Sequence, residues 1–144
     1  MTGDALLAFA AKLVATYPHD EAACRAAISR CYYGAFHLAN ALLIELGFAD
    51  VGHDHGRVAQ HLAESNHAEA TEAGQLLSAL YTFRRRADYD LANSRHGQAL
   101  LARQCVERSH RLRQLLAGCH AEEVKRVLTE SITTYRAKLR PRSP

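Results

Sequence analysis

The segment Ser29–His37 contains an arginine, a tyrosine and a histidine at helical spacing. Arg30 and His37 are seven residues apart, an offset that returns to within about 20° of the same direction on an α-helix. Tyr33 lies between them on that face, and Gly34 adds no side chain. A histidine can move a proton near neutral pH, and a guanidinium can stabilise the charge that develops on a phosphate. The spacing therefore predicts that Arg30 and His37 catalyse cleavage of RNA through its own 2′-hydroxyl, with Tyr33 binding the RNA.

A second polar cluster is the segment Phe83–Asp90, which contains three consecutive arginines. On a helix, Arg86 faces Tyr89 one turn later, and Arg84 can reach Asp88 four residues on. The helix macrodipole also favours arginine near a C-terminus, but three in succession exceed what capping requires. The residues that we assign from this cluster are Arg86, Asp88 and Tyr89 for catalysis and Arg84 and Arg85 for RNA binding.

Each cluster also has a purely structural interpretation, which the residues alone leave open. In that interpretation Arg30 pairs with a neighbouring carboxylate, His37 is a half-buried core histidine, and the arginine run is a solvated helix end. For His53-Asp54-His55, a metal site is the weaker alternative because the spacing matches no known ligand motif. We expect Asp54 to be a helix N-cap flanked by exposed histidines, and we expect no metal or other cofactor.

Length and composition indicate one soluble domain. A chain of 144 residues that is 48% hydrophobic and 23% charged can bury a core without disulfides or metals. The chain shows no CxxC pair and no leader-like segment, which predicts reduced thiols and a cytoplasmic location. No apolar stretch approaches the roughly 20 residues needed to span a bilayer. Phosphate-binding glycine loops, GxSxG elbows and zinc-finger spacings do not occur in the sequence.

The charge is distributed unevenly along the chain. The formal net charge is only +3, but residues 1–83 carry 4 Lys/Arg against 9 Asp/Glu, and residues 84–144 carry 14 against 6. A basic half of this kind is compatible with a phosphate-binding face. Arginine outnumbers lysine 15 to 3, which a GC-rich genome also produces, so charge alone leaves nucleic-acid binding open.

Hydrophobic residues at intervals of three and four predict helices throughout. The expected helices are a first one stopping near Pro18, a second from Asp20 to Gly47, a short third from Asp54 to Asn66, a fourth ending near Asn93, a fifth closing at Gly118 and a last one reaching Leu139. Period-2 alternation and hairpin signals are missing, so strands are not expected. The sequence thus predicts an all-α, antiparallel up-and-down bundle of five to six helices over residues 1–138, followed by a disordered basic tail at 139–144.

Three segments in the same order resemble the HEPN superfamily. They are Arg25-Ala-Ala-Ile-Ser-Arg30-Cys-Tyr-Tyr-Gly-Ala-Phe-His37, His55-Gly56-Arg57-Val58 and Leu80-Tyr-Thr-Phe-Arg-Arg-Arg86-Ala-Asp-Tyr89-Asp. The resemblance implies a four- or five-helix bundle, commonly a homodimer, whose active members are metal-independent ribonucleases. It also implies that an R-x4–6-H motif from each subunit lines a shared cleft. Many members act as toxins or defence proteins, and some are paired with a nucleotidyltransferase antitoxin.

The position of the motif differs from that of the active members. There it lies late in the bundle, where this chain has Arg86-Ala-Asp-Tyr89 and where the first following histidine is His96. Arg30 and His37 satisfy R-x6-H, but on the second helix. Three hypotheses follow: a HEPN-type ribonuclease acting as a toxin or defence protein, a non-catalytic HEPN module that binds RNA, a nucleotide or a nucleotidyltransferase, and a purely structural helical dimer.

Overall fold

Six α-helices make up the chain in the computed structural model, which describes residues 1–139. The helices are α1 (Gly3–Thr16), α2 (Glu21–Glu45), α3 (His55–Ala63), α4 (Ala68–Tyr89), α5 (Ala99–Ala117) and α6 (Glu122–Leu139). Three short 3₁₀ turns lie at Ala49–Val51, Ser94–Gly97 and Gly118–His120. With six helices and no strand over residues 1–139, the predicted all-α bundle is confirmed.

The helix ends follow from local chemistry. The side chains of Asp20 and Asp54 accept hydrogen bonds from backbone amides three residues on, at 3.1 and 3.2 Å, so both predicted N-caps are confirmed. Gly47 has a φ of +96°, and the amide of Phe48 donates to the carbonyl of Leu43 at 2.8 Å, which ends the second helix in a Schellman-type turn. Two helices end earlier than predicted: α3 at Ala63 instead of near Asn66, and α4 at Tyr89 instead of near Asn93. A side chain from α2 binds the terminal carbonyl groups of α4.

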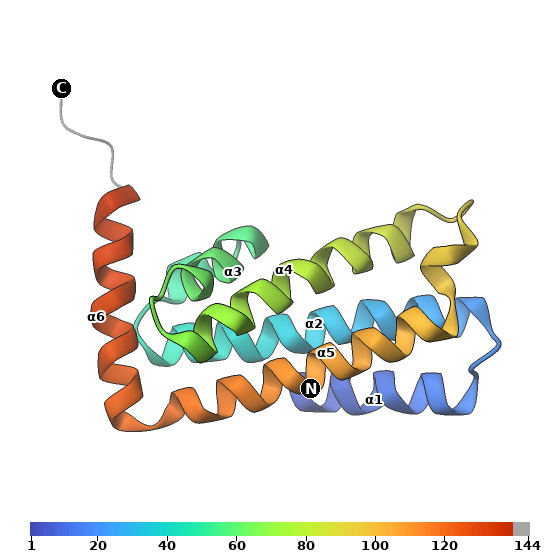
Figure 1. Cartoon of the computed structure of the whole chain (residues 1–144), viewed down its shortest axis with the longest axis horizontal. Helices are drawn as coiled ribbons and strands as arrows, with labels where there is room; N and C mark the ends of the chain where they lie inside the picture. Colours follow the sequence, from blue (N-terminus) through green and yellow to red (C-terminus); the bar gives the residue numbers. More distant parts are fainter. Residues whose placement is uncertain (140–144) are drawn as a thin grey trace.

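The central helix is α2, which packs against α1, α4 and α5 (Figure 1). Gly34 allows α1 and α2 to touch: a Cβ atom at this position would lie 2.6 Å from Leu7 Cδ2 and 2.9 Å from the carbonyl oxygen of Gly3. The sequence suggested that Gly34 leaves a gap in a surface patch. In the structure that gap is filled by α1, so Gly34 serves helix packing.

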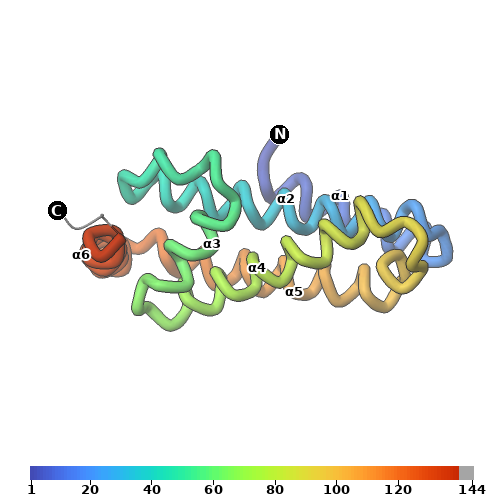
Figure 2. Tube along the Cα trace, turned by 90° about the horizontal axis from the view of Figure 1, so that it is seen from above, coloured from blue at the N-terminus to red at the C-terminus, as the bar shows by residue number. Residues whose placement is uncertain are grey.

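The last helix lies crosswise over one end of the bundle in Figure 1, and Figure 2 shows it end-on. Arg136 holds it there through two hydrogen bonds to the carboxylate of Asp50, at 2.9 and 2.6 Å, and Lys125 donates to Glu45 at 3.0 Å. Of the predicted tail at 139–144, Leu139 is the last residue of α6, and 140–144 lie outside the described residues. Within residues 1–139, none of the helices combines the length and the apolar character that crossing a membrane requires.

Candidate nucleic-acid interface

An open groove of about 500 Å³ runs along the C-terminal turns of α4. Its lining consists of Tyr81, Thr82, Arg85, Arg86, Tyr89 and Asp90. Arg85 and Arg86 are exposed, and Tyr89 is 73% exposed, so two cations and an aromatic ring are available to a ligand. The groove therefore combines three residues that the sequence assigned to RNA recognition or catalysis.

The first arginine of the run points the other way. Arg84 is only 8% exposed, and its guanidinium carbon lies 5.2 to 6.0 Å from the centres of four tyrosine rings. The rings belong to Tyr32, Tyr33, Tyr81 and Tyr89. Its charge is paired with Asp88 at 3.6 Å, as the spacing predicted, and Asp88 also accepts a hydrogen bond from the Ser29 hydroxyl at 3.3 Å. Arg84 thus does not line the groove but is buried among tyrosine rings of α2 and α4, where cation–π contacts hold it.

None of the candidate residues on α2 lines the groove. Arg30 and His37 are exposed, and over residues 1–139 no hydrogen bond or ion pair connects either of them to the groove. Tyr33 is half-buried and contacts the Arg84 guanidinium, at 5.5 Å from the ring centre. The structure therefore brings Tyr33, but neither Arg30 nor His37, into contact with the arginine run.

His55 is a functional candidate that the sequence placed among exposed histidines. Its ring is half-buried and stacks on Phe36 at 4.2 Å, and the Tyr32 hydroxyl is hydrogen-bonded to its Nδ1. Burial and the nearby Arg84 cation lower the pKa of His55, so the imidazole is neutral at pH 7. Because the partners of His55 come from other helices, no spacing along the chain could have predicted this environment.

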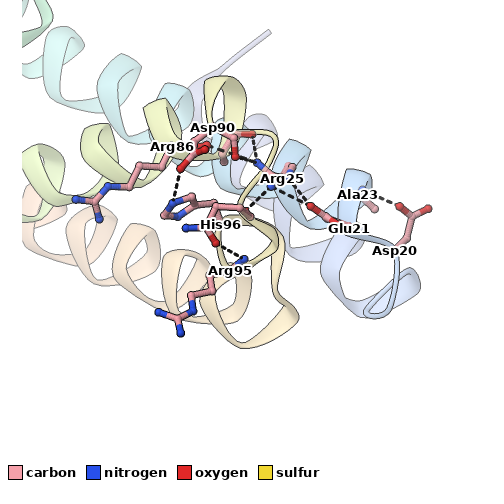
Figure 3. Close-up of polar contacts among 10 residues, drawn as sticks. Asp20, Glu21, Ala23, Arg25, Arg86, Asp90, Arg95 and His96 are labelled. Carbon is pink, nitrogen blue, oxygen red and sulfur yellow. Dashed lines mark hydrogen bonds and ion pairs between the residues drawn. The ribbon is translucent and has the colours of Figure 1, made fainter.

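A second histidine comes close to the groove from the turn after α4. His96 Nε2 lies 3.1 Å from Asp90 Oδ2, and Asp90 lines the groove beside Arg86 (Figure 3). In the sequence, His96 is the first histidine after the arginine run, and it lies beyond the predicted end of the fourth helix near Asn93. The turn at Asn93 folds the chain back so that the histidine meets the last residues of the helix.

Comparison with protein families supplies one match. The family model described as the HEPN domain matches residues 15–124, which is more than half of the chain and includes α2 to α5. No match was found among curated proteins or among solved structures. Most of α6 lies beyond the matched region.

Proposed function

Because the chain belongs to the HEPN domain family, which includes ribonucleases and nucleotide-binding modules, we propose that it is a metal-independent endoribonuclease acting at the α4 groove. The observation that carries the proposal is the combination of two exposed arginines, two tyrosines and a histidine–aspartate pair in and beside one groove. The biological role that goes with this activity, by resemblance to the family, is that of a toxin or defence protein.

Binding follows from the lining of the groove. Arg85 and Arg86 neutralise backbone phosphates, an interaction that does not depend on sequence. Tyr81 and Tyr89 offer ring faces on which unpaired bases can stack. A groove along one helix with aromatic residues eight positions apart suits a flexible single strand. We therefore expect single-stranded RNA as the substrate.

Cleavage uses the substrate's own 2′-hydroxyl. The 2′-oxygen attacks phosphorus and forms a new P–O bond, the P–O5′ bond breaks, and a 2′,3′-cyclic phosphate and a 5′-hydroxyl result. We assign the acceptance of the 2′-hydroxyl proton to His96 Nδ1, because its other ring nitrogen, Nε2, lies 3.1 Å from Asp90 Oδ2 and is taken up by the ion pair with that carboxylate. Arg86 stabilises the charge that develops on the phosphate. The departing 5′-oxygen takes up a proton from the protonated imidazole.

The earlier assignment of His37 and Arg30 stays a prediction. Their face on α2 is solvent-exposed, and a ribonuclease that used it would take its substrate across Tyr33 instead of along the groove. Substitutions at His37 and His96 therefore compare two sites in one molecule. In HEPN ribonucleases the cleft is shared between two subunits, so we also propose a homodimer, with a nucleotidyltransferase as its antitoxin partner.

A non-catalytic module is the second candidate, favoured by the absence of a histidine on α4 after the arginine run. Such a protein binds RNA or a nucleotide in the same groove. Its affinity falls with salt, as for any phosphate-binding site, but it shows no turnover.

The test is cleavage of an end-labelled single-stranded RNA pool in EDTA. We expect the parent protein to leave 2′,3′-cyclic phosphate ends, His96→Gln and Arg86→Ala to lose cleavage, and His37→Gln to keep it. Loss of cleavage in His37→Gln but not in His96→Gln would show that the active site lies on α2 and not at the α4 groove. Salt-dependent binding without cleavage by the parent protein would establish the binding module instead.

A further inference from the structure

The side chain of Arg25 links the start of α2 to the end of α4. Arg25 is 8% exposed, and its Nη1 donates to the carbonyl of Ala87 at 2.9 Å and to that of Asp90 at 3.1 Å. Its Nη2 donates to the carbonyl of Asn93 at 2.7 Å. Carbonyl groups at a helix C-terminus lack partners within the helix, and here one guanidinium supplies them. Arg25 therefore determines where the chain leaves α4.

The turn that carries His96 rests on the same side chain. A Cβ atom at Gly97 would lie 2.5 Å from Glu21 Cγ and 3.0 Å from both Cγ and Nε of Arg25. Glu21 in turn accepts a hydrogen bond from Arg25 Nε at 3.0 Å, which fixes the plane of the guanidinium (Figure 3). The segment from Ala87 to Gly97 is thus bonded to Arg25 on one side and packed against it on the other.

We infer that Arg25 is a positioning residue for the groove: it holds the last turn of α4 and the following turn so that His96 meets Asp90. The inference rests on the proposed function only for its catalytic consequence. The planar fork of arginine can bind carbonyls from two chain segments at once, whereas the single ammonium group of lysine cannot reproduce that geometry. A charge-conserving substitution therefore isolates the role of the fork.

The experiment compares Arg25→Lys with the parent protein by amide hydrogen exchange, by NMR of the His96 ring and by RNA cleavage. We expect exchange over residues 88–97 to rise at least about tenfold while the rest of α4 is unchanged. The His96 ring signals, assigned with His96→Gln, should shift. Cleavage should fall about 100-fold in kcat with a much smaller rise in KM, because Arg85 and Arg86 stay in place and, of the binding residues, only Tyr89 lies in the loosened segment.

Two further variants keep the test decisive. Gly97→Ala forces the turn away from Arg25 without altering that side chain, so it should reproduce the effects even where Arg25→Lys fails to fold. Arg108→Lys is the matched control. The guanidinium carbon of Arg108 lies 4.9 Å from the centre of the Phe83 ring, and no hydrogen bond links Arg108 to the turn over residues 1–139. This substitution should leave both the exchange over residues 88–97 and the cleavage of RNA unchanged.

The outcomes separate this inference from the proposed function. Unchanged exchange and unchanged ring signals in both Arg25→Lys and Gly97→Ala would overturn the positioning role. Altered signals with full cleavage would support the positioning role and would refute the use of the His96–Asp90 pair in catalysis. A parent protein that does not cleave RNA refutes the ribonuclease, and exchange and ring signals then decide the role of Arg25 on their own.

Discussion

Replacing Arg84 with methionine should destabilise the fold, whereas replacing the adjacent Arg85 with alanine should weaken RNA binding. Methionine keeps much of the apolar part of the Arg84 side chain and removes the guanidinium with its charge and N–H donors. The guanidinium is enclosed by four tyrosine rings, and a desolvated cation–π interaction contributes up to about 2 kcal/mol. Loss of the ion pair with Asp88 adds up to about 1 kcal/mol, because that carboxylate is partly solvated. The expected loss in free energy of unfolding is therefore about 2–3 kcal/mol.

Urea denaturation followed by circular dichroism measures this loss, and a titration of labelled RNA at several salt concentrations measures binding. Arg85→Ala, which removes an exposed side chain, should change the free energy of unfolding by less than about 0.5 kcal/mol. It should also reduce the slope of log affinity against log salt by about 0.7, the value for one phosphate contact on a single strand. The reasoning is refuted if Arg84→Met unfolds at the urea concentration of the parent protein, or if Arg85→Ala lowers stability as much as Arg84→Met.

Three further predictions concern packing, pH and catalysis. Gly34→Val should lower the free energy of unfolding by about 2–3 kcal/mol in urea titrations, because the added atoms would overlap Leu7 and the α1 backbone; a stable variant would contradict the packing of α1 on α2. Burial lowers the pKa of His61 below its usual 6.5, so the unfolded chain binds more protons than the folded one, and stability should fall as the pH drops below about 6.5. Urea midpoints at pH 7.5 and 5.5 check this, and a fall that is no smaller in His61→Gln would argue against it. Asp90→Asn should reduce RNA cleavage about 100-fold without weakening binding, since the amide cannot orient or stabilise the His96 imidazolium as the carboxylate does; unaltered cleavage in the labelled-RNA assay would rule out the pair.

The features that the sequence predicted well are local ones. The caps at Asp20 and Asp54 and the stop at Gly47 depend on residues within one or two turns, so their chemistry is visible in the order of residues. The pairing of Arg84 with Asp88 is local in the same sense. These elements define the helices that carry the groove.

The features that the sequence could not predict join distant parts of the chain. His55 meets Tyr32 and Phe36 across two helices, and Arg25 meets the end of α4 more than sixty residues away. His96 reaches Asp90 only because the chain reverses after α4. Periodicity assigns a face to each residue of one helix, but it does not say which faces of two helices meet.

The run of three arginines shows how packing divides roles that the sequence leaves equivalent. Successive residues on a helix point about 100° apart, so burying one arginine of the run turns the next two toward solvent. Tyr32 and Tyr33 of α2 hold Arg84 inward together with the buried apolar face of α4, and this packing leaves Arg85 and Arg86 exposed along the groove. The central helix supplies no residue to the groove lining, yet it contributes to fixing the rotation of α4 about its axis. A substitution on α2 can therefore alter RNA recognition without touching RNA.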